Sequence, residues 1–162
     1  MRAVLFLILA LMLSGCTFRP VYEAGGSTEA LTAALSSVEV APVPDRLGQI
    51  MTNQLVDRIG GGGSLDYRLE IALDQSTRGF GVRQDASVAQ EELILLATMR
   101  LVDLDGKAVV EETLRARSSY DVVLSDFANV QQREDAARRL VLDLANRIER
   151  RLVLYFSDTV TE

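Results

Sequence analysis

One residue of this sequence has a readily assigned covalent chemistry: Cys16, the only cysteine in the chain. It follows the small residues Ser14 and Gly15, which end an apolar run at positions 3–13 that begins directly after Arg2. A run of eleven residues is too short to span a bilayer, which takes about 20 residues as a helix, and its positive start is typical of a secretory signal segment. The pattern predicts cleavage before Cys16 and acylation of its thiol.

This arrangement resembles the lipobox of bacterial lipoproteins, so we expect removal of residues 1–15 and membrane anchoring through acyl chains on Cys16. Thr17, the next residue, is not the aspartate that resembles an inner-membrane retention signal, which favours the outer membrane. Two alternatives stay open: an ordinary signal peptide with an incidental free thiol, and a buried N-terminal helix. A lone cysteine cannot form an intramolecular disulfide in an exported chain, which favours lipidation.

Four arginines are candidates for binding a ligand or a partner, because a guanidinium donates paired hydrogen bonds to phosphate and carboxylate oxygens. Arg115 and Arg117 share the polar face of a predicted strand, and Arg78 and Arg83 lie in a polar stretch between two predicted strands. An alternative interpretation is that they form ion pairs on a solvated surface. The acidic side chains near enough in sequence or register are Glu111, Glu112, Asp85 and Glu91.

The sequence offers no set of side chains for acid–base or metal chemistry. It has no histidine, its cysteine is assigned to lipidation, and Lys107 is the only lysine. The usual general bases and soft metal ligands are therefore missing, and we predict no enzyme, no catalytic residues, no metal site and no cofactor. A formal net charge of −6 argues against nucleic acid as a partner.

Two strands and a helix are predicted in the first half of the mature chain. Residues 38–43 alternate apolar and polar side chains and include Pro42, which is typical of an edge strand. Asp45 is expected to cap a helix over residues 46–59, where apolar side chains recur every three or four positions. Residues 65–74 alternate regularly, which predicts a half-buried strand.

A hairpin is predicted next. The polar residues 75–89 indicate a long exposed hairpin end, and the nearly continuous apolar residues 93–102 indicate a central strand covered on both faces, or on one face by another protein. The pair Asp105-Gly106 favours a two-residue type I′ turn, because both residues tolerate a positive φ angle. The returning strand is expected over residues 108–123.

A long amphipathic helix is predicted over residues 125–156. The expected fold class is α+β, with two helices packed on one face of a roughly four-stranded mixed or antiparallel sheet in the order β-α-β-β-β-α. The predicted core includes Leu69, Ile71, Leu95, Leu114, Leu144 and Ile148. The chain then divides into a signal peptide at 1–15, a lipidated N-terminus and tether at 16–37, a single domain at 38–156 and a polar tail at 157–162.

Two segments carry a resemblance to a known family: Cys-Thr-Phe-Arg-Pro-Val-Tyr at positions 16–22, and Arg-Glu-Asp-Ala-Ala-Arg-Arg-Leu at positions 133–140. With the order of elements, they make the chain similar to the lipopolysaccharide-assembly lipoprotein family LptE of alphaproteobacteria. The resemblance implies an outer-membrane lipoprotein that sits in the lumen of the LptD β-barrel, helps the barrel assemble and assists delivery of lipopolysaccharide to the cell surface. The domain would face the periplasm and the barrel lumen.

The implied partners are LptD, lipopolysaccharide and, through the acyl chains, the membrane. No ligand-binding residue of the family can be carried over to a position of this chain, so the four arginines stay candidates from their charge alone. Two other classes remain open. One is a lipoprotein accessory subunit of an envelope lipid ABC-type transport system, and the other is a lipid-anchored hydrolase, for which the lack of histidine excludes a Ser-His-Asp triad.

Overall fold

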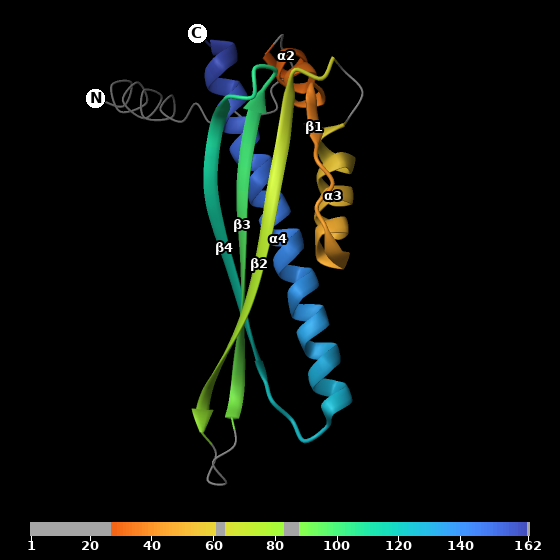
Figure 1. Cartoon of the computed structure of the whole chain (residues 1–162), viewed down its shortest axis with the longest axis vertical. Helices are drawn as coiled ribbons and strands as arrows, with labels where there is room; N and C mark the ends of the chain where they lie inside the picture. Colours follow the sequence, from red (N-terminus) through yellow and green to blue (C-terminus); the bar gives the residue numbers. More distant parts are fainter. Residues whose placement is uncertain (1–26, 61–63, 83–87, 162) are drawn as a thin grey trace, which may run out of the picture.

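The computed structural model describes residues 27–60, 64–82 and 88–161. Over these ranges the chain forms three helices and four strands, arranged as a long narrow domain (Figure 1). In chain order the elements are α2 (Ser27–Ser36), β1 (Val38–Val40), α3 (Asp45–Ile59), β2 (Tyr67–Val82), β3 (Val88–Asp103), β4 (Ala108–Asp121) and α4 (Asp126–Thr161).

The four strands form one mixed sheet in the order β1-β2-β3-β4. β1 pairs in parallel with the start of β2, whereas β2, β3 and β4 form an antiparallel meander. α4 runs along one face of this sheet, and α3 lies next to it on the β1 side (Figure 1). We call the face covered by α4 the inner face and the opposite one the outer face. The predicted α+β class is confirmed, with one helix more than expected.

Strand alternation separates the two faces clearly in β3, the middle strand of the meander. Leu95, Ala97 and Met99 point to the inner face and are buried. Ile94 and Leu96 point to the outer face and are half-buried. No helix or strand of the described ranges covers the outer face (Figure 1). The alternative of a strand covered on both faces by its own chain is therefore excluded for the described residues, and the alternative in which another protein covers one face remains.

The core lies between the inner face and α4. It contains five of the six predicted core residues: Leu69, Ile71, Leu95, Leu144 and Ile148. Leu114 packs against this core but is only half-buried, because it lies on β4, the outermost strand on its side of the sheet. The prediction of a buried Leu114 is therefore corrected to a position at the margin of the core.

The exposed hairpin end predicted at residues 75–89 is mostly strand. β2 continues to Val82 and β3 already begins at Val88, with Gln75 opposite Leu95 in the ladder. Residues 74–81 are all exposed. Their polar composition reflects solvent on both faces of the strand and does not indicate an irregular backbone. The predicted exposed hairpin end is therefore confirmed for residues 75–81, and strand pairing continues through them because antiparallel hydrogen bonds satisfy the backbone regardless of side-chain polarity.

The β3–β4 hairpin lies where it was predicted, but its turn is of another type. The N–H of Asp103 donates to the carbonyl of Lys107, and the N–H of Gly106 donates to the carbonyl of Asp103, both at 3.0 Å. Gly106 has a φ angle of 77°, as expected for a three-residue loop that ends in a glycine bulge. The Asp103 carboxylate accepts the N–H groups of Asp105 and Lys107, which favours this loop over the predicted two-residue turn.

Both ends of the described chain contain more helix than predicted. α2 (Ser27–Ser36) occupies part of the segment expected to be a tether, and its Leu31 and Leu35 pack against the core. Alanine-rich sequence favours a helix, and this packing fixes it. α4 continues past residue 156 to Thr161, through the expected tail. Within the described ranges, no helix is both long and apolar enough to cross a membrane.

The start of α3 is set by close packing rather than by a side-chain cap. Pro44 occupies the N-cap position and no side chain caps the helix, so the predicted capping role of Asp45 is wrong. Asp45 is instead the first helical residue and has a φ angle of 69°. A Cβ atom on Gly48 would lie 2.6 Å from Cγ1 of Val43. Glycine is required here because the preceding segment lies directly against the helix.

Candidate functional site

The outer face of the sheet carries three of the four arginines identified in the sequence. Arg115 and Arg117 are exposed on β4 and lie opposite Leu96 and Ile94 of β3. Alternate strand residues share a face, so the prediction that the two arginines point the same way is confirmed. The two guanidinium groups border the half-buried apolar pair on β3.

Arg78 lies on the same outer face, because its register partner is Glu92 of β3. Nη1 of Arg117 is 3.7 Å from Oε1 of Glu92, and the Arg117 side chain is 70% exposed, so this ion pair is loose. Arg83 lies outside the described residues. In the described part of the chain, Arg117 therefore pairs with none of the acidic residues expected from sequence: Glu111, Glu112, Asp85 and Glu91.

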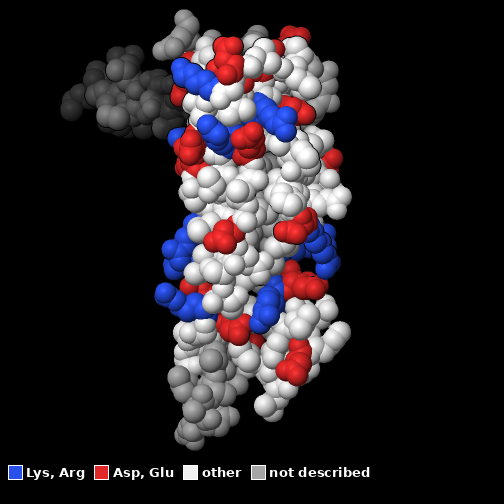
Figure 2. Space-filling view, in the orientation of Figure 1, with Lys and Arg blue, Asp and Glu red and all other residues white. Residues whose placement is uncertain are grey.

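Acidic and basic side chains are mixed over the outer face and form no patch of one sign (Figure 2). Arg100 and Glu111, for example, lie 3.8 Å apart with both side chains about half exposed. An uncharged band separates two groups of charges in Figure 2. On the same face, the hydroxyl oxygens of Thr98 and Thr113 are 3.1 Å apart. The outer face is therefore hydrated and mixed in charge, with apolar side chains at Ile94 and Leu96 and, near the hairpin end, at the exposed Phe80.

A second polar cluster joins three elements on the inner side of the sheet. Glu91 of β3 accepts a hydrogen bond from the hydroxyl of Tyr120 of β4. Arg133 of α4 donates from Nε to the Tyr120 oxygen at 3.0 Å and from Nη2 to Oε2 of Glu91 at 3.1 Å. We call these three residues the Glu91 cluster. It ties the first part of α4 to the two strands beneath it.

The Glu91 cluster has its charges fixed near neutral pH. The hydrogen bond from Tyr120, together with Arg133, lowers the pKa of Glu91 against the opposing effect of burial. Burial raises the pKa of Tyr120, and the hydrogen bonds to Tyr120 and Glu91 raise the pKa of Arg133. The carboxylate is therefore ionised, the phenol protonated and the guanidinium charged. Such a cluster holds elements together and supplies no group that exchanges a proton near neutral pH.

This cluster is not among the residues predicted from the sequence. A hairpin centred on Asp105-Gly106 places Glu91 opposite Tyr120, and the observed register has this pair. This half of the cluster could therefore have been found from the register. The reach of Arg133 depends on where α4 crosses the sheet, and no sequence pattern gives that crossing point.

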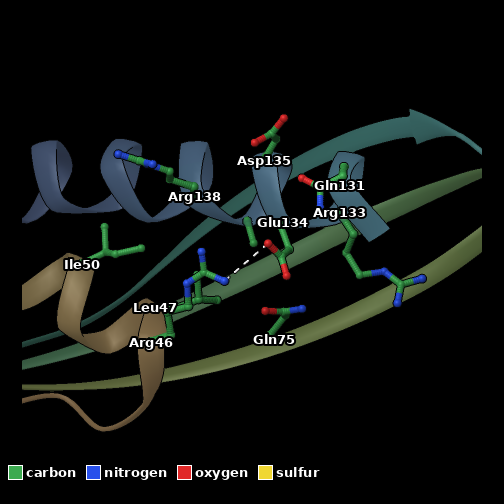
Figure 3. A pocket seen from close by; sticks show the side chains of 10 residues that line it. Arg46, Leu47, Ile50, Gln75, Gln131, Arg133, Glu134, Asp135 and Arg138 are labelled. Atoms are coloured by element: carbon green, nitrogen blue, oxygen red, sulfur yellow. Dashed lines mark hydrogen bonds and ion pairs between the residues drawn. The ribbon is translucent and has the colours of Figure 1, made fainter. Parts of the chain in front are cut away.

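A groove of about 380 Å³ lies where the start of α3 faces α4 (Figure 3). Its apolar part includes Leu47 and Ile50. Nη1 of Arg46 is 3.4 Å from Oε2 of Glu134 across the groove, with both side chains at least half exposed. The other lining arginines, on α4, point in different directions in Figure 3. No anion-binding centre is formed by converging guanidinium groups among these residues.

Within the described ranges, no group of three His, Cys, Asp or Glu side chains is placed to hold a metal ion. The fold and its surfaces define a class of protein: a small α+β domain with its helices on one face of a mixed sheet and the other sheet face exposed. Residues 34–152 match the sequence model of the LptE family, whose description is lipopolysaccharide assembly. The chain belongs to this family.

The chain is also similar to individual proteins and solved structures. The chain is 24% identical over 157 residues to an uncharacterised protein of Rickettsia prowazekii, covering 96% of this chain and 98% of that one. It is similar to the crystal structure of a protein described as a lipoprotein from Caulobacter crescentus, with a TM-score of 0.62, 23% identity, and coverage of 80% of this chain and 96% of that one. Rare lipoprotein B from Shewanella oneidensis gives a TM-score of 0.57 at 14% identity, covering 76% and 96%. The two structures show the shared fold.

Proposed function

We propose that this protein is an outer-membrane lipoprotein that occupies the lumen of the LptD β-barrel, assists assembly of the barrel and helps deliver lipopolysaccharide to the cell surface. The match to a lipopolysaccharide-assembly family over residues 34–152 supports the role in assembly. The observation that favours a position inside a barrel is the outer face. Barrel interiors are polar and hydrated, and a sheet face with exposed charges of both signs is suited to such an environment.

The proposed anchor is Cys16, lipidated after removal of residues 1–15, with the domain facing the periplasm and the barrel lumen. The domain would act as a plug and assembly factor without chemistry of its own. This agrees with the fixed charges of the Glu91 cluster, the largest hydrogen-bonded side-chain cluster that we find in the described residues.

The proposed contacts to lumen carboxylates or lipopolysaccharide phosphates are Arg78, Arg83, Arg115 and Arg117. Arg115 and Arg117 are the best placed of the described ones. The Arg117 guanidinium is held only by the loose contact to Glu92, and no ion pair of the Arg115 guanidinium occurs in the described part of the chain. Exposed guanidinium groups without tight partners can form new charge-assisted hydrogen bonds at small cost.

The test is a double charge reversal, Arg115→Glu with Arg117→Glu. We expect weaker co-purification with LptD or weaker binding of purified lipopolysaccharide, with an unchanged melting temperature because both side chains are exposed. The matched control is Arg139→Glu with Arg150→Glu. These two arginines are exposed on α4 and make the same change in net charge away from the outer face.

The proposal is contradicted if both double variants reduce co-purification equally, because net charge would then explain the loss. It also fails if depletion of the protein leaves barrel assembly and surface lipopolysaccharide unchanged. Co-purification of the wild-type chain with an ABC-type system, and not with a barrel, would favour the accessory-subunit alternative.

A further inference from the structure

β2 has a partner strand along only a small part of its outer edge. β1 pairs with it over Val38–Val40 and residues 67–69, and one more hydrogen bond runs from the N–H of Ala41 to the carbonyl of Leu69 at 2.9 Å. Figure 1 accordingly shows β1 beside only the first part of β2. The sheet therefore loses its fourth strand at this point, while β2 continues to Val82.

The sequence after β1 explains why pairing stops. Pro42 and Pro44 have no N–H to donate, so they cannot continue a ladder. The N–H between them, on Val43, donates to Oγ1 of Thr52 on α3 at 3.2 Å. The chain is thus drawn away from β2 and into the helix, which leaves the rest of the β2 edge open.

The open edge presents backbone groups at every second residue. The carbonyl of Leu69 points toward β1, and strand geometry repeats this orientation with a period of two. The residues that follow in the same orientation are Ile71, Leu73, Gln75 and Thr77. In the described part of the chain, these residues have no strand on the side away from β3. Unpaired edges of this kind are templates for another strand.

A cavity lies at this edge, between β2 and residues 43–48, which include the charged Asp45 and Arg46. It has a volume of about 470 Å³, and its lining includes Ile71 and Leu73 of β2, Leu95 of β3 and Leu47 of α3. It also shares Leu47 with the groove between α3 and α4. A strand added to the edge would turn every second side chain toward the inner face, where this cavity could accept an apolar one.

We propose that the β2 edge from Ile71 to Thr77 binds an extended segment of a partner polypeptide, which continues the line of β1 and places apolar side chains in the cavity. The unpaired N–H and C=O groups decide the class of partner. A polypeptide backbone can satisfy them in series, whereas a hydrocarbon chain cannot. This proposal does not require the partner to be LptD, so it can fail while the proposed function holds.

The test measures amide hydrogen exchange, at single-residue resolution, in two states of the full mature chain. One state is captured with its partners from detergent-solubilised membranes, and the other is the chain separated from them in the same detergent. We expect the amides of Leu73, Gln75 and Thr77 to exchange about tenfold more slowly in the captured state. The amides of Ala72 and Asp74, which face β3, should be protected in both states.

Gln75→Pro removes one outward N–H without removing a bond to β3, and Gln75→Ala is the control that keeps it. The proline variant should lose the added protection at Leu73 and Thr77, and the alanine variant should keep it. If Gln75→Pro lowers the melting temperature, Thr77→Lys replaces it, because an edge lysine opposes strand addition on an exposed position.

Three results would overturn the proposal. The first is equal exchange of the outward amides in both states. The second is protection of the isolated chain by purified lipopolysaccharide alone, which would make the occupant an amphiphile. The third is protection that rises with the concentration of the isolated chain, which would make the occupant a second copy.

Discussion

Arg133 of α4 hydrogen-bonds to side chains on two different strands, the carboxylate of Glu91 on β3 and the phenol of Tyr120 on β4. No other described side chain of α4 does this. The next residue on the helix, Glu134, instead forms an ion pair with Arg46 of α3. Because the pKa of Glu91 is lowered in the folded protein, this carboxylate stabilises the fold in its ionised form. The stabilisation is present above the unfolded-state pKa and is lost as the pH falls through the folded-state value.

Glu91→Gln tests this. At about pH 7 the variant should unfold at a lower urea concentration than the wild type, and the difference should shrink as the pH falls below 4.5, the ordinary pKa of glutamate, because the wild-type carboxyl then becomes neutral as well. Urea midpoints at about pH 7 and about pH 3 measure it. Glu111→Gln, on the exposed outer face, is the control and should change little. A gap of equal size at both pH values would contradict the assignment.

The candidate site could be predicted from sequence most directly where one strand carries it. Arg115 and Arg117 are two residues apart, so alternation alone places them on one face, as observed. Their partners depend in addition on the register of the β3–β4 hairpin. Arg117 contacts Glu92 across the ladder, and the register of the hairpin must be known to a single residue before this pair can be found.

The predictions for whole elements succeeded where side chains divide between core and water. The alternation at residues 65–74 and the stripe of α4 each had one buried and one wet side, and both elements exist there, although β2 continues to Val82 and α4 to Thr161. Residues 74–81 of β2 have no buried side, so hydrophobic periodicity carries no signal there. α2 was missed for another reason: packing against the core fixes this short helix, and its sequence alone is only weakly amphipathic.

α4 should contribute strongly to the stability of the domain, because its apolar side chains cover the inner face of the sheet. Leu144→Ala removes a side chain with 0% exposure and should lower the free energy of unfolding by about 2–5 kcal/mol. Leu124→Ala is the matched control, since Leu124 is fully exposed before α4 and should change stability by less than about 0.5 kcal/mol. Denaturant unfolding measures both. A similar loss for the two variants would place Leu144 outside the core.

The two ends of the whole molecule are built differently. α2 and the end of α4 lie together at one end, and the β2–β3 hairpin reaches the other (Figure 1). β1 and α3 lie only at the end that contains α2 (Figure 1). The hairpin end therefore consists of β2, β3, β4 and the beginning of α4, which the Glu91 cluster ties to the sheet. The chain enters the described domain through α2. An anchor at Cys16 would therefore attach the molecule by its helical end and direct the hairpin end away from the point of attachment.

Cys16→Ser tests the anchor. Without the thiol no thioether to diacylglycerol can form, so the variant should keep residues 1–15 or leave the membrane fraction, and the N-terminal peptide should lack acyl mass. The core consists of later residues, so the melting temperature of the domain should not change. Thr17→Ser is the control and should be processed and acylated like the wild type. Mass spectrometry of the N-terminal peptide and fractionation of membranes measure the outcome. An unmodified Cys16 thiol in the wild-type protein would refute lipidation, and the orientation inferred for the hairpin end would then lose its basis.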